Sequence, residues 1–253
     1  ASWGIAVTNG AAWTTPSFSK SSPVQAEYQL CFKCHSSWAY GGSPPIAPSG
    51  GFAQTDQSKE FNVNNASYHW VEGDQSADSG VTPRTYDGRN MTLKAGSGWT
   101  ATSRMACTDC HASETGTDLR GSHGSTQPFL LSGRWTAGAG GDGTGKANTS
   151  NDLCFQCHDW NIYGQEGSNR AATASGFSDG SENLHVRHLG FSSVTSCQSC
   201  HSAIPHGNQK RALLVETTDP APYNQGGSYG SKLQVLRWAA SGNWQESDCG
   251  TCH

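Results

Sequence analysis

Apolar side chains are scarce in this chain. They make up 34% of its 253 residues, against roughly 45–50% in a typical globular domain. Thirty-one glycines and many serines and threonines take their place. Side chains this polar bury too little surface to offset the entropy lost on folding. Because nine tryptophans argue against a disordered chain, we expect a bound cofactor to supply the missing apolar mass.

Long hydrophobic runs and basic blocks are also absent. No segment approaches the roughly 18–20 consecutive apolar residues of a transmembrane helix. The net charge is -4 and no cluster of Lys and Arg occurs, which argues against a nucleic-acid partner. The sequence begins at Ala1 without an initiator methionine or an apolar leader. We therefore expect an exported chain that has lost its signal peptide, and N-x-S/T triplets at Asn65, Asn90 and Asn148 are compatible with export without settling glycosylation.

All ten cysteines fall into one pattern, C-x-x-C-H, which occurs five times. The copies are Cys31-Phe-Lys-Cys34-His35, Cys107-Thr-Asp-Cys110-His111, Cys154-Phe-Gln-Cys157-His158, Cys197-Gln-Ser-Cys200-His201 and Cys249-Gly-Thr-Cys252-His253. This pattern is typical of c-type haem attachment. The two thiols add across the two vinyl groups of the macrocycle, and the adjoining histidine becomes the proximal iron ligand. The sequence thus predicts five covalently bound haem c groups.

Two other uses of C-x-x-C fit the pattern less well. Vicinal disulfides do not require a following histidine, and five chance placements of a residue at this frequency have a probability on the order of 10⁻⁷. Zinc sites built on C-x-x-C combine two half-sites per metal, so five half-sites would leave one without a partner.

Five further histidines lie outside the motifs. They are His69, His123, His185, His188 and His206. One free histidine per haem predicts distal ligands and bis-histidine iron at every site. His185 and His188 lie three residues apart, so on a helix they would share a face toward two neighbouring haems. For one of these two, contact with a propionate or with solvent is the alternative. Packing is the expected role of Met91 and Met105.

The chain also repeats itself. Leu30 to His35 resembles Leu153 to His158, and each copy is followed by free histidines, a second motif and a His-Gly pair. We expect one haem-organised domain over residues 1–253, made of two tandem two-haem units (about 1–150 and 151–248) and a terminal motif at 249–253. Stretches rich in Gly, Ser, Pro, Asp and Asn favour loops. The predicted fold is mostly irregular coil with short helices around a stack of haems.

Short helices are expected next to several motifs. Ser22 and Pro23 have the types of a helix cap and first turn leading to Cys31. Ser150 would cap a second helix through Cys157, and a third is expected over residues 232–240.

The motif pairs carry a resemblance to a known class. The stretch from Cys107 through Gly121-Ser-His-Gly124 to His158, and its repeat from Cys197 to His253, resemble the doubled C-x-x-C-H module of multihaem cytochromes c. Within that class the chain is similar in design to secreted cytochromes that polymerise into extracellular nanowires. That resemblance implies bis-histidine haems in a continuous stack and, in some members, a distal histidine from the next subunit.

These features predict electron transfer without substrate chemistry, so we do not expect an enzyme. Two forms stay open: a filament subunit that binds copies of itself and conducts to external acceptors, and a discrete shuttle between redox proteins. The expected location is extracellular or at the cell surface, with the periplasm as the alternative. The rival is a multihaem reductase, which needs one open distal position. In pentahaem nitrite reductases a lysine replaces one motif histidine, whereas all five motifs here keep histidine.

Overall fold

The structure is a computed structural model of the chain. It describes residues 3–42, 54–73, 85–86, 89–90, 93–94, 96–99, 103–114, 122–134, 152–164, 169–189, 197–216, 218–223, 234–239 and 242–250. The predictions for Cys252 and His253, for Asn148 and for Met91 lie outside these residues. Among the described residues no helix is long and apolar enough to cross a membrane.

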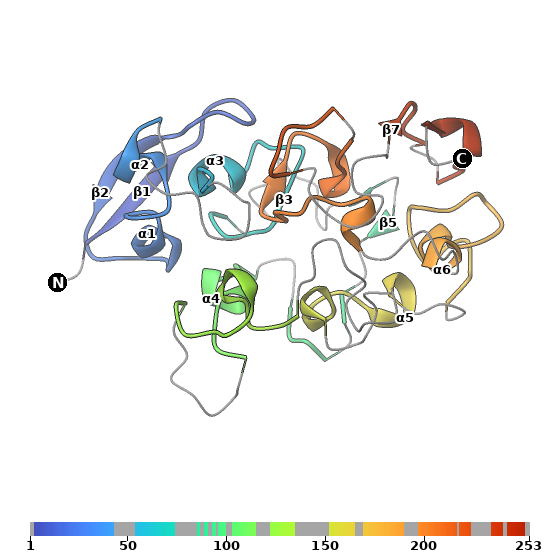
Figure 1. Cartoon of the computed structure of the whole chain (residues 1–253), viewed down its shortest axis with the longest axis horizontal. Helices are drawn as coiled ribbons and strands as arrows, with labels where there is room; N and C mark the ends of the chain where they lie inside the picture. Colours follow the sequence, from blue (N-terminus) through green and yellow to red (C-terminus); the bar gives the residue numbers. More distant parts are fainter. Residues whose placement is uncertain are drawn as a thin grey trace.

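Regular structure is sparse and comes in short pieces (Figure 1). The α-helices are α1 (Tyr28–Cys31), α2 (Ser37–Tyr40), α3 (Gln57–Glu60), α4 (Cys107–Cys110), α5 (Trp160–Tyr163) and α6 (Leu184–Leu189). The 3₁₀ turns are η2 (Pro128–Leu130), η3 (Leu153–Gln156), η4 (Cys197–Ser199), η5 (Arg211–Leu213) and η6 (Glu246–Asp248). The strands are β1 (Gly4–Thr8), β2 (Ser17–Ser21), β3 (Ser67–Tyr68), β4 (Thr85–Tyr86), β5 (Arg89–Asn90), β6 (Gly207–Asn208), β7 (Gln234–Val235) and β8 (Cys249–Gly250). The prediction of mostly irregular coil with short helices agrees with this architecture.

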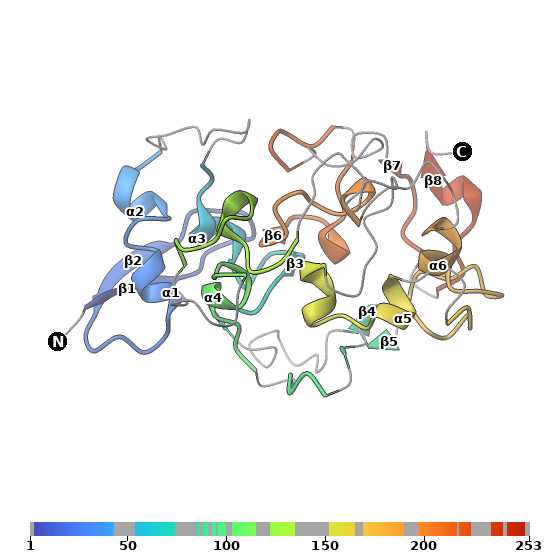
Figure 2. The same ribbon diagram turned by 60° about the horizontal axis from the view of Figure 1, so that its bottom comes forward.

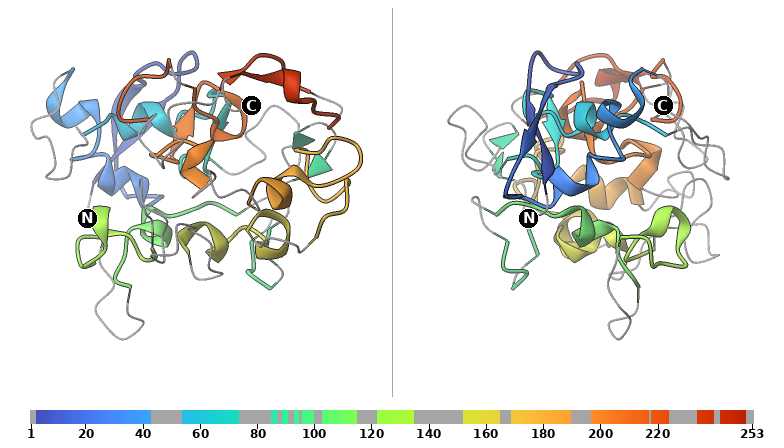
Figure 3. Two further views of the ribbon diagram at one scale, coloured as in Figure 1. Left: turned by 45° about the vertical axis from the view of Figure 1, so that its right-hand side comes forward. Right: turned by 90° about the vertical axis from the view of Figure 1, so that its left-hand side faces the viewer.

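The elements are spread along an elongated molecule. The β1–β2 pair, α1 and α2 lie at one end, and α6, β7 and β8 lie at the other (Figures 1 and 2). The segments that hold α4 and α5 follow one side of the molecule, which the two views of Figure 3 show in green and yellow. Side-chain clusters are correspondingly local. One gathers Ile5, Tyr28, Phe32, Phe61 and Val71 near α1.

The strands form four separate antiparallel pairs: β1–β2, β3–β6, β4–β5 and β7–β8. The β3–β6 pair joins segments about 140 positions apart in the sequence, with Ser67 opposite Asn208 and Tyr68 opposite Gly207. It therefore ties the first predicted two-haem unit to the second near the middle of the molecule (Figure 1).

The predicted helix starts were partly wrong. Ser22 and Pro23 precede α1 by several residues, a cis peptide bond joins them, and the N-cap of α1 is Glu27. The second helix begins beside Asp152 as the short 3₁₀ turn η3 rather than at Ser150. Within residues 234–239 the chain forms β7 instead of a helix, because Gln234 and Val235 pair with β8.

Candidate haem-binding sites

The four described motif histidines each close a single helical turn. The histidine N–H donates to the carbonyl of the first motif cysteine at 2.8–2.9 Å in every case. The pairs are His35 with Cys31, His111 with Cys107, His158 with Cys154, and His201 with Cys197. A turn of this kind brings residues four apart to one face. The first thiol and the imidazole of each motif therefore lie on the same side of the chain.

Each of these motif histidines faces a different free histidine. The ring centroids are 6.1 Å apart for His35 and His123, and 6.0 Å for His111 and His206. They are 6.4 Å apart for His158 and His69, and 6.5 Å for His201 and His185. The sequence predicted the members of these pairs but could not say which distal histidine faces which motif.

The spacing of the pairs fits one iron between two imidazoles. A metal–imidazole bond is about 2 Å long, and a ring nitrogen lies about 1.1 Å from its ring centre, so two axial imidazoles on one metal place their centroids about 6.3 Å apart. The four measured separations, 6.0–6.5 Å, bracket this value. The angles between the ring planes range from 5° to 69°. This range agrees with axial coordination because each ring turns independently about its bond to the metal.

A second feature of ligand histidines is the partner of the other ring nitrogen. A metal-bound histidine almost always donates its second N–H to a carbonyl or carboxylate, which fixes the ring orientation. Nδ1 of His111 lies 3.0 Å from the Phe129 carbonyl, and Nδ1 of His201 lies 2.7 Å from the Ala212 carbonyl. Such a partner on Nδ1 leaves Nε2 as the atom that would bind iron.

The distal histidines are oriented in the same way. Nδ1 of His69 contacts the Pro205 carbonyl, and Nδ1 of His188 lies 2.7 Å from the Leu184 carbonyl. The Ser175 hydroxyl lies 3.1 Å from Nδ1 of His185. The partner of His206 is a carboxylate, Oε2 of Glu60 at 2.7 Å. His123 is exposed, with the Ser122 hydroxyl 3.5 Å from its Nδ1.

The carbonyls that hold His111 and His201 come from strained backbone. Phe129 and Ala212 have φ of 59° and 54°, and the leucine after each is also in the left-handed region. Such conformations cost of order 1–3 kcal/mol per non-glycine residue and cluster at functional sites. Sequence reasoning missed these two residues. The available signal was the repeated Leu-Leu pair that follows the second motif of each two-haem unit, at Leu130 and Leu213.

Two distal histidines lie next to each other on the β3–β6 ladder. His69 directly follows β3, His206 directly precedes β6, and the His69 N–H donates to the His206 carbonyl at 2.9 Å. His69 faces the motif histidine of the second predicted unit, and His206 faces that of the first. The two predicted units therefore exchange distal histidines, and the short ladder sets the position of both.

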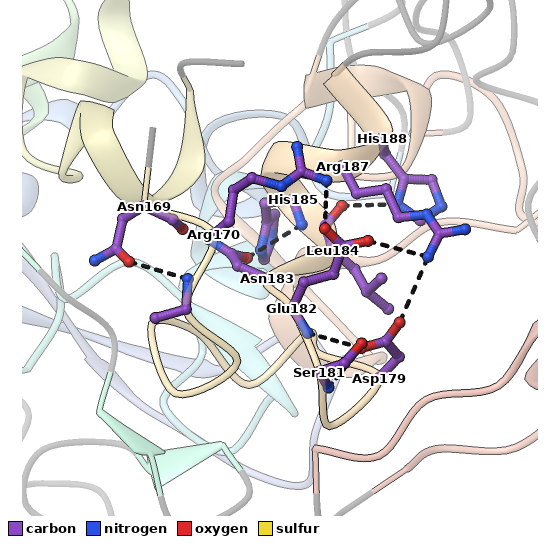
Figure 4. Close-up of polar contacts among 11 residues, drawn as sticks. Asn169, Arg170, Asp179, Ser181, Glu182, Asn183, Leu184, His185, Arg187 and His188 are labelled. Atoms are coloured by element: carbon purple, nitrogen blue, oxygen red, sulfur yellow. Dashed lines mark hydrogen bonds and ion pairs between the residues drawn. The ribbon is translucent and has the colours of Figure 1, made fainter. Parts of the chain in front are cut away.

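Helix α6 presents the other adjacent pair, His185 and His188 (Figure 4). Both histidines lie on a helix, the case in which their three-residue spacing puts them on one face, and Phe177 packs against both imidazoles, with its centroid 5.3 Å from His185 and 5.2 Å from His188. Around the helix, Arg187 pairs with Glu182 at 3.1 Å and with Asp179 at 3.5 Å. These ion pairs are on the exposed side of the helix, which lies at the end of the molecule that also contains Cys249.

The fifth motif is described only up to Gly250. Cys249 packs against a cluster of Leu184, Ala239 and Trp244, which brings the start of this motif to α6. The four described pairs include His69, His123, His185 and His206, and His188 is the fifth histidine outside the motifs. His253, with which we expect it to pair, lies outside the described residues.

Burial favours the neutral form of five of these histidines. It lowers the pKa of His158 and His185 to about 3 and that of His111 to about 4. Burial also lowers the pKa of His69 and His201. A neutral imidazole has a free ring nitrogen lone pair, which is the form that binds a metal.

Cysteines of successive motifs lie side by side. The thiols of Cys31 and Cys107 and a carboxylate oxygen of Glu27 all lie within 4.8 Å of one another. The Cys154 thiol contacts that of Cys197, which raises the pKa of Cys154 and lowers the pKa of Cys197. The first site thus adjoins the second, and the third adjoins the fourth. Because both thiols of the Glu27 group belong to attachment motifs, we do not assign it a separate metal.

Several arginines are engaged by carboxylates of the chain. Arg134 pairs with Asp152 at 2.8 Å, and Arg237 pairs with Asp248 at 2.6 Å. Arg170 pairs with Glu182. These ion pairs give the arginines a role in holding the loops around the motifs.

Comparison with known proteins gives one match. Residues 100–162 match the family model for the doubled CXXCH motif. This segment includes the second and third motifs and His123, and the match indicates covalently bound haem c in a multihaem cytochrome that takes part in electron transfer. No curated protein and no solved structure matches the chain.

Proposed function

We propose that this chain is a pentahaem electron-transfer cytochrome in which every iron is held by two histidines. The observation that carries this proposal is the set of four imidazole pairs with centroids 6.0–6.5 Å apart. The proposed ligand pairs are His35 with His123, His111 with His206, His158 with His69, His201 with His185, and His253 with His188. Each haem would supply a one-electron redox centre, without any bond being made or broken.

The residues of the chain would then have three tasks. The motif cysteines would attach each haem, and each pair of imidazoles would hold one iron and leave it no position for a substrate. Backbone carbonyls and Glu60 would hold the imidazole rings in place. A site with both axial positions filled suits electron transfer rather than substrate turnover. We therefore propose that the chain is not an enzyme.

The order of the sites favours a continuous path. The contacts between Cys31 and Cys107 and between Cys154 and Cys197 join sites one to two and three to four. Distal His206 of site two and distal His69 of site three are joined by a backbone hydrogen bond. Helix α6 holds one distal histidine for site four and one for site five. We propose that electrons cross the molecule in this order, between the α1 end and the α6 end.

The number of bound haems and the number of irons that can bind an added ligand test the proposal. Intact mass spectrometry of the purified protein is expected to give the mass of the chain plus five haem groups. The ferrous protein is expected to show no carbon monoxide complex. A lower haem count would contradict the pentahaem assignment, and a carbon monoxide complex on one haem would favour the reductase alternative.

The biological setting has two forms within this proposal. As the subunit of an extracellular conductive filament, the chain would bind copies of itself, and as a discrete periplasmic or surface shuttle it would bind other redox proteins. The placement of the first and last sites at opposite ends of an elongated molecule suits both forms (Figure 1). Negative-stain electron microscopy of the native protein separates them. Regular thin filaments would establish the polymer, and only small particles after concentration would exclude it in favour of the shuttle.

A further inference from the structure

Glu60 differs from the other groups that hold ligand histidines. Nδ1 of His111, His188 and His201 contacts a backbone carbonyl and Nδ1 of His185 contacts a serine hydroxyl, whereas His206 has the carboxylate of Glu60 at 2.7 Å. The Glu60 side chain is fully buried, at 0% exposure. Among the described residues it is the only carboxylate placed on a candidate iron ligand.

The surroundings of Glu60 keep its carboxylate in one place. Oε2 faces His206, and Oε1 accepts from the Tyr223 hydroxyl at 2.7 Å. Both oxygens of the carboxylate therefore have a hydrogen-bonding partner. If His206 binds iron through Nε2, its Nδ1 carries the proton and donates to Oε2. The backbone carbonyl of Glu60 is fixed as well, since Asn65 Nδ2 donates to it at 2.7 Å.

The absence of a side chain at Gly207 lets the segment after His206 pass close to the backbone of Glu60. A Cβ atom at position 207 would overlap the backbone carbonyl oxygen of Glu60, so Gly207 is needed for the strand to pass. Gly207 directly follows His206 and pairs with Tyr68 in the β3–β6 ladder. The contact between the carboxylate and the histidine is therefore part of the rigid centre of the molecule.

We propose that Glu60 is a positioning residue that sets the reduction potential of the second site, the one held by His111 and His206. This inference depends on the proposed function, because it assumes that His206 is an iron ligand. A carboxylate that accepts the Nδ1 proton makes the imidazole a stronger electron donor. Its buried negative charge also favours the more positive, ferric state. Both effects lower the potential of this site, and hydrogen bonding to the ligand is one of the means by which proteins tune haem iron.

Replacement of the carboxylate by a neutral amide tests the proposal. Glu60→Gln keeps an oxygen that accepts from His206 while it removes the charge. In a spectroscopic redox titration of the holoprotein, one haem of five is expected to titrate at a higher midpoint potential. One-fifth of the absorbance change should therefore move to that higher potential. The expected size is about tenfold in the ferric–ferrous equilibrium, which is about 59 mV for one electron. The other four components are expected to stay in place.

A second variant and a control separate tuning from packing. Tyr223→Phe removes the donor to Oε1, so more of the carboxylate charge acts on His206 and the same component is expected to shift downward. Glu72→Gln changes another buried acid, which bonds to Asn9 at 2.6 Å instead of to a histidine. Burial raises the pKa of Glu72 to about 8, so at pH 7 this control removes little charge and is expected to shift no component.

Two results would overturn the inference. One is an unchanged titration in Glu60→Gln, and the other is a Tyr223→Phe variant that shifts no component or shifts one upward. If Glu60→Gln yields no holoprotein, the Tyr223→Phe titration decides alone. Carbon monoxide binding by the unaltered protein is a separate result. It would contradict the proposed bis-histidine function. If no carbon monoxide binds and neither variant shifts a reduction potential, only the role of Glu60 is contradicted.

Discussion

At the scale of single residues, the candidate sites have similar imidazole separations but different hydrogen-bond partners. The centroid separations vary by only 0.5 Å, from 6.0 to 6.5 Å. The Nδ1 partners range from backbone carbonyls to a buried carboxylate. Because groups that hydrogen-bond to a metal ligand tune the metal, we expect the proposed haems to differ in reduction potential.

Gly207 allows a direct test of the close packing beside His206. Alanine at this position would place a methyl group against the Glu60 carbonyl oxygen. Overpacking of this kind costs typically 1–3 kcal/mol, so Gly207→Ala is expected to lower the thermal unfolding midpoint of the holoprotein. Gly42→Ala is the matched control, since a Cβ there meets nothing within 4 Å. Equal midpoints for the two variants would contradict the packing described around Glu60.

Glu72 makes stability depend on pH. Burial raises the pKa of its carboxyl from 4.5 to about 8, so the folded chain holds this proton more tightly than the unfolded chain does. The resulting contribution to stability is fully present below pH 4.5 and is lost as pH rises through about 8. As the pH rises from 5 to 8, the thermal unfolding midpoint is expected to fall less in Glu72→Gln than in the unaltered protein. Parallel profiles would show that Glu72 does not titrate in this range.

At the scale of elements, short pieces of regular structure hold pairs of ligands. The β3–β6 ladder places His69 and His206, and α6 places His185 and His188. The three-residue spacing of His185 and His188 showed that a helix would place both on one face, although the sequence did not by itself predict the helix. It could not predict the ladder, because two-residue strands separated by about 140 positions leave no local pattern. The partners Phe129 and Ala212 were missed for a similar reason, since a carbonyl can come from any residue type.

Helix α6 offers a test of whether one helix positions two iron ligands, His185 and His188. Val186 is fully buried between the two histidines. Proline there disfavours the helical conformation of the preceding residue, His185, and replaces a fully buried side chain. Val186→Pro is therefore expected to open two sites, with two carbon monoxide molecules bound per reduced chain. Arg187→Ala removes only exposed ion pairs and is the control, with none expected. A single carbon monoxide bound by Val186→Pro would contradict the assignment of both histidines.

At the scale of the whole molecule, the described side chains pack in local clusters joined by short strand pairs. The scarcity of apolar residues predicts that a cofactor supplies the rest of the core, and this stays a prediction. The attachment motifs and the free histidines were recognisable because their residue types are fixed by haem chemistry. The pairing of those histidines was not recognisable from the sequence, because it depends on how the two predicted units pack against each other. The prediction of one domain with two tandem units stays a prediction.

The exchange of His69 and His206 between the two predicted units has a measurable consequence. His69 lies in the first unit and faces His158 in the second, so His69→Ala is expected to open the third site and leave the second intact. His206→Ala is expected to open the second site instead. Each variant should bind one carbon monoxide per reduced chain. The double variant should bind two, and binding of only one would show that both histidines serve the same iron.

The proposed function requires two histidine ligands on each of five irons. Titration of the fully reduced, unaltered protein with carbon monoxide, followed by difference spectroscopy, tests this ligation. No carbon monoxide complex is expected at any concentration that leaves the protein folded. One or more molecules bound per five haems would contradict it, because an iron with an open or weakly held axial position would then be present.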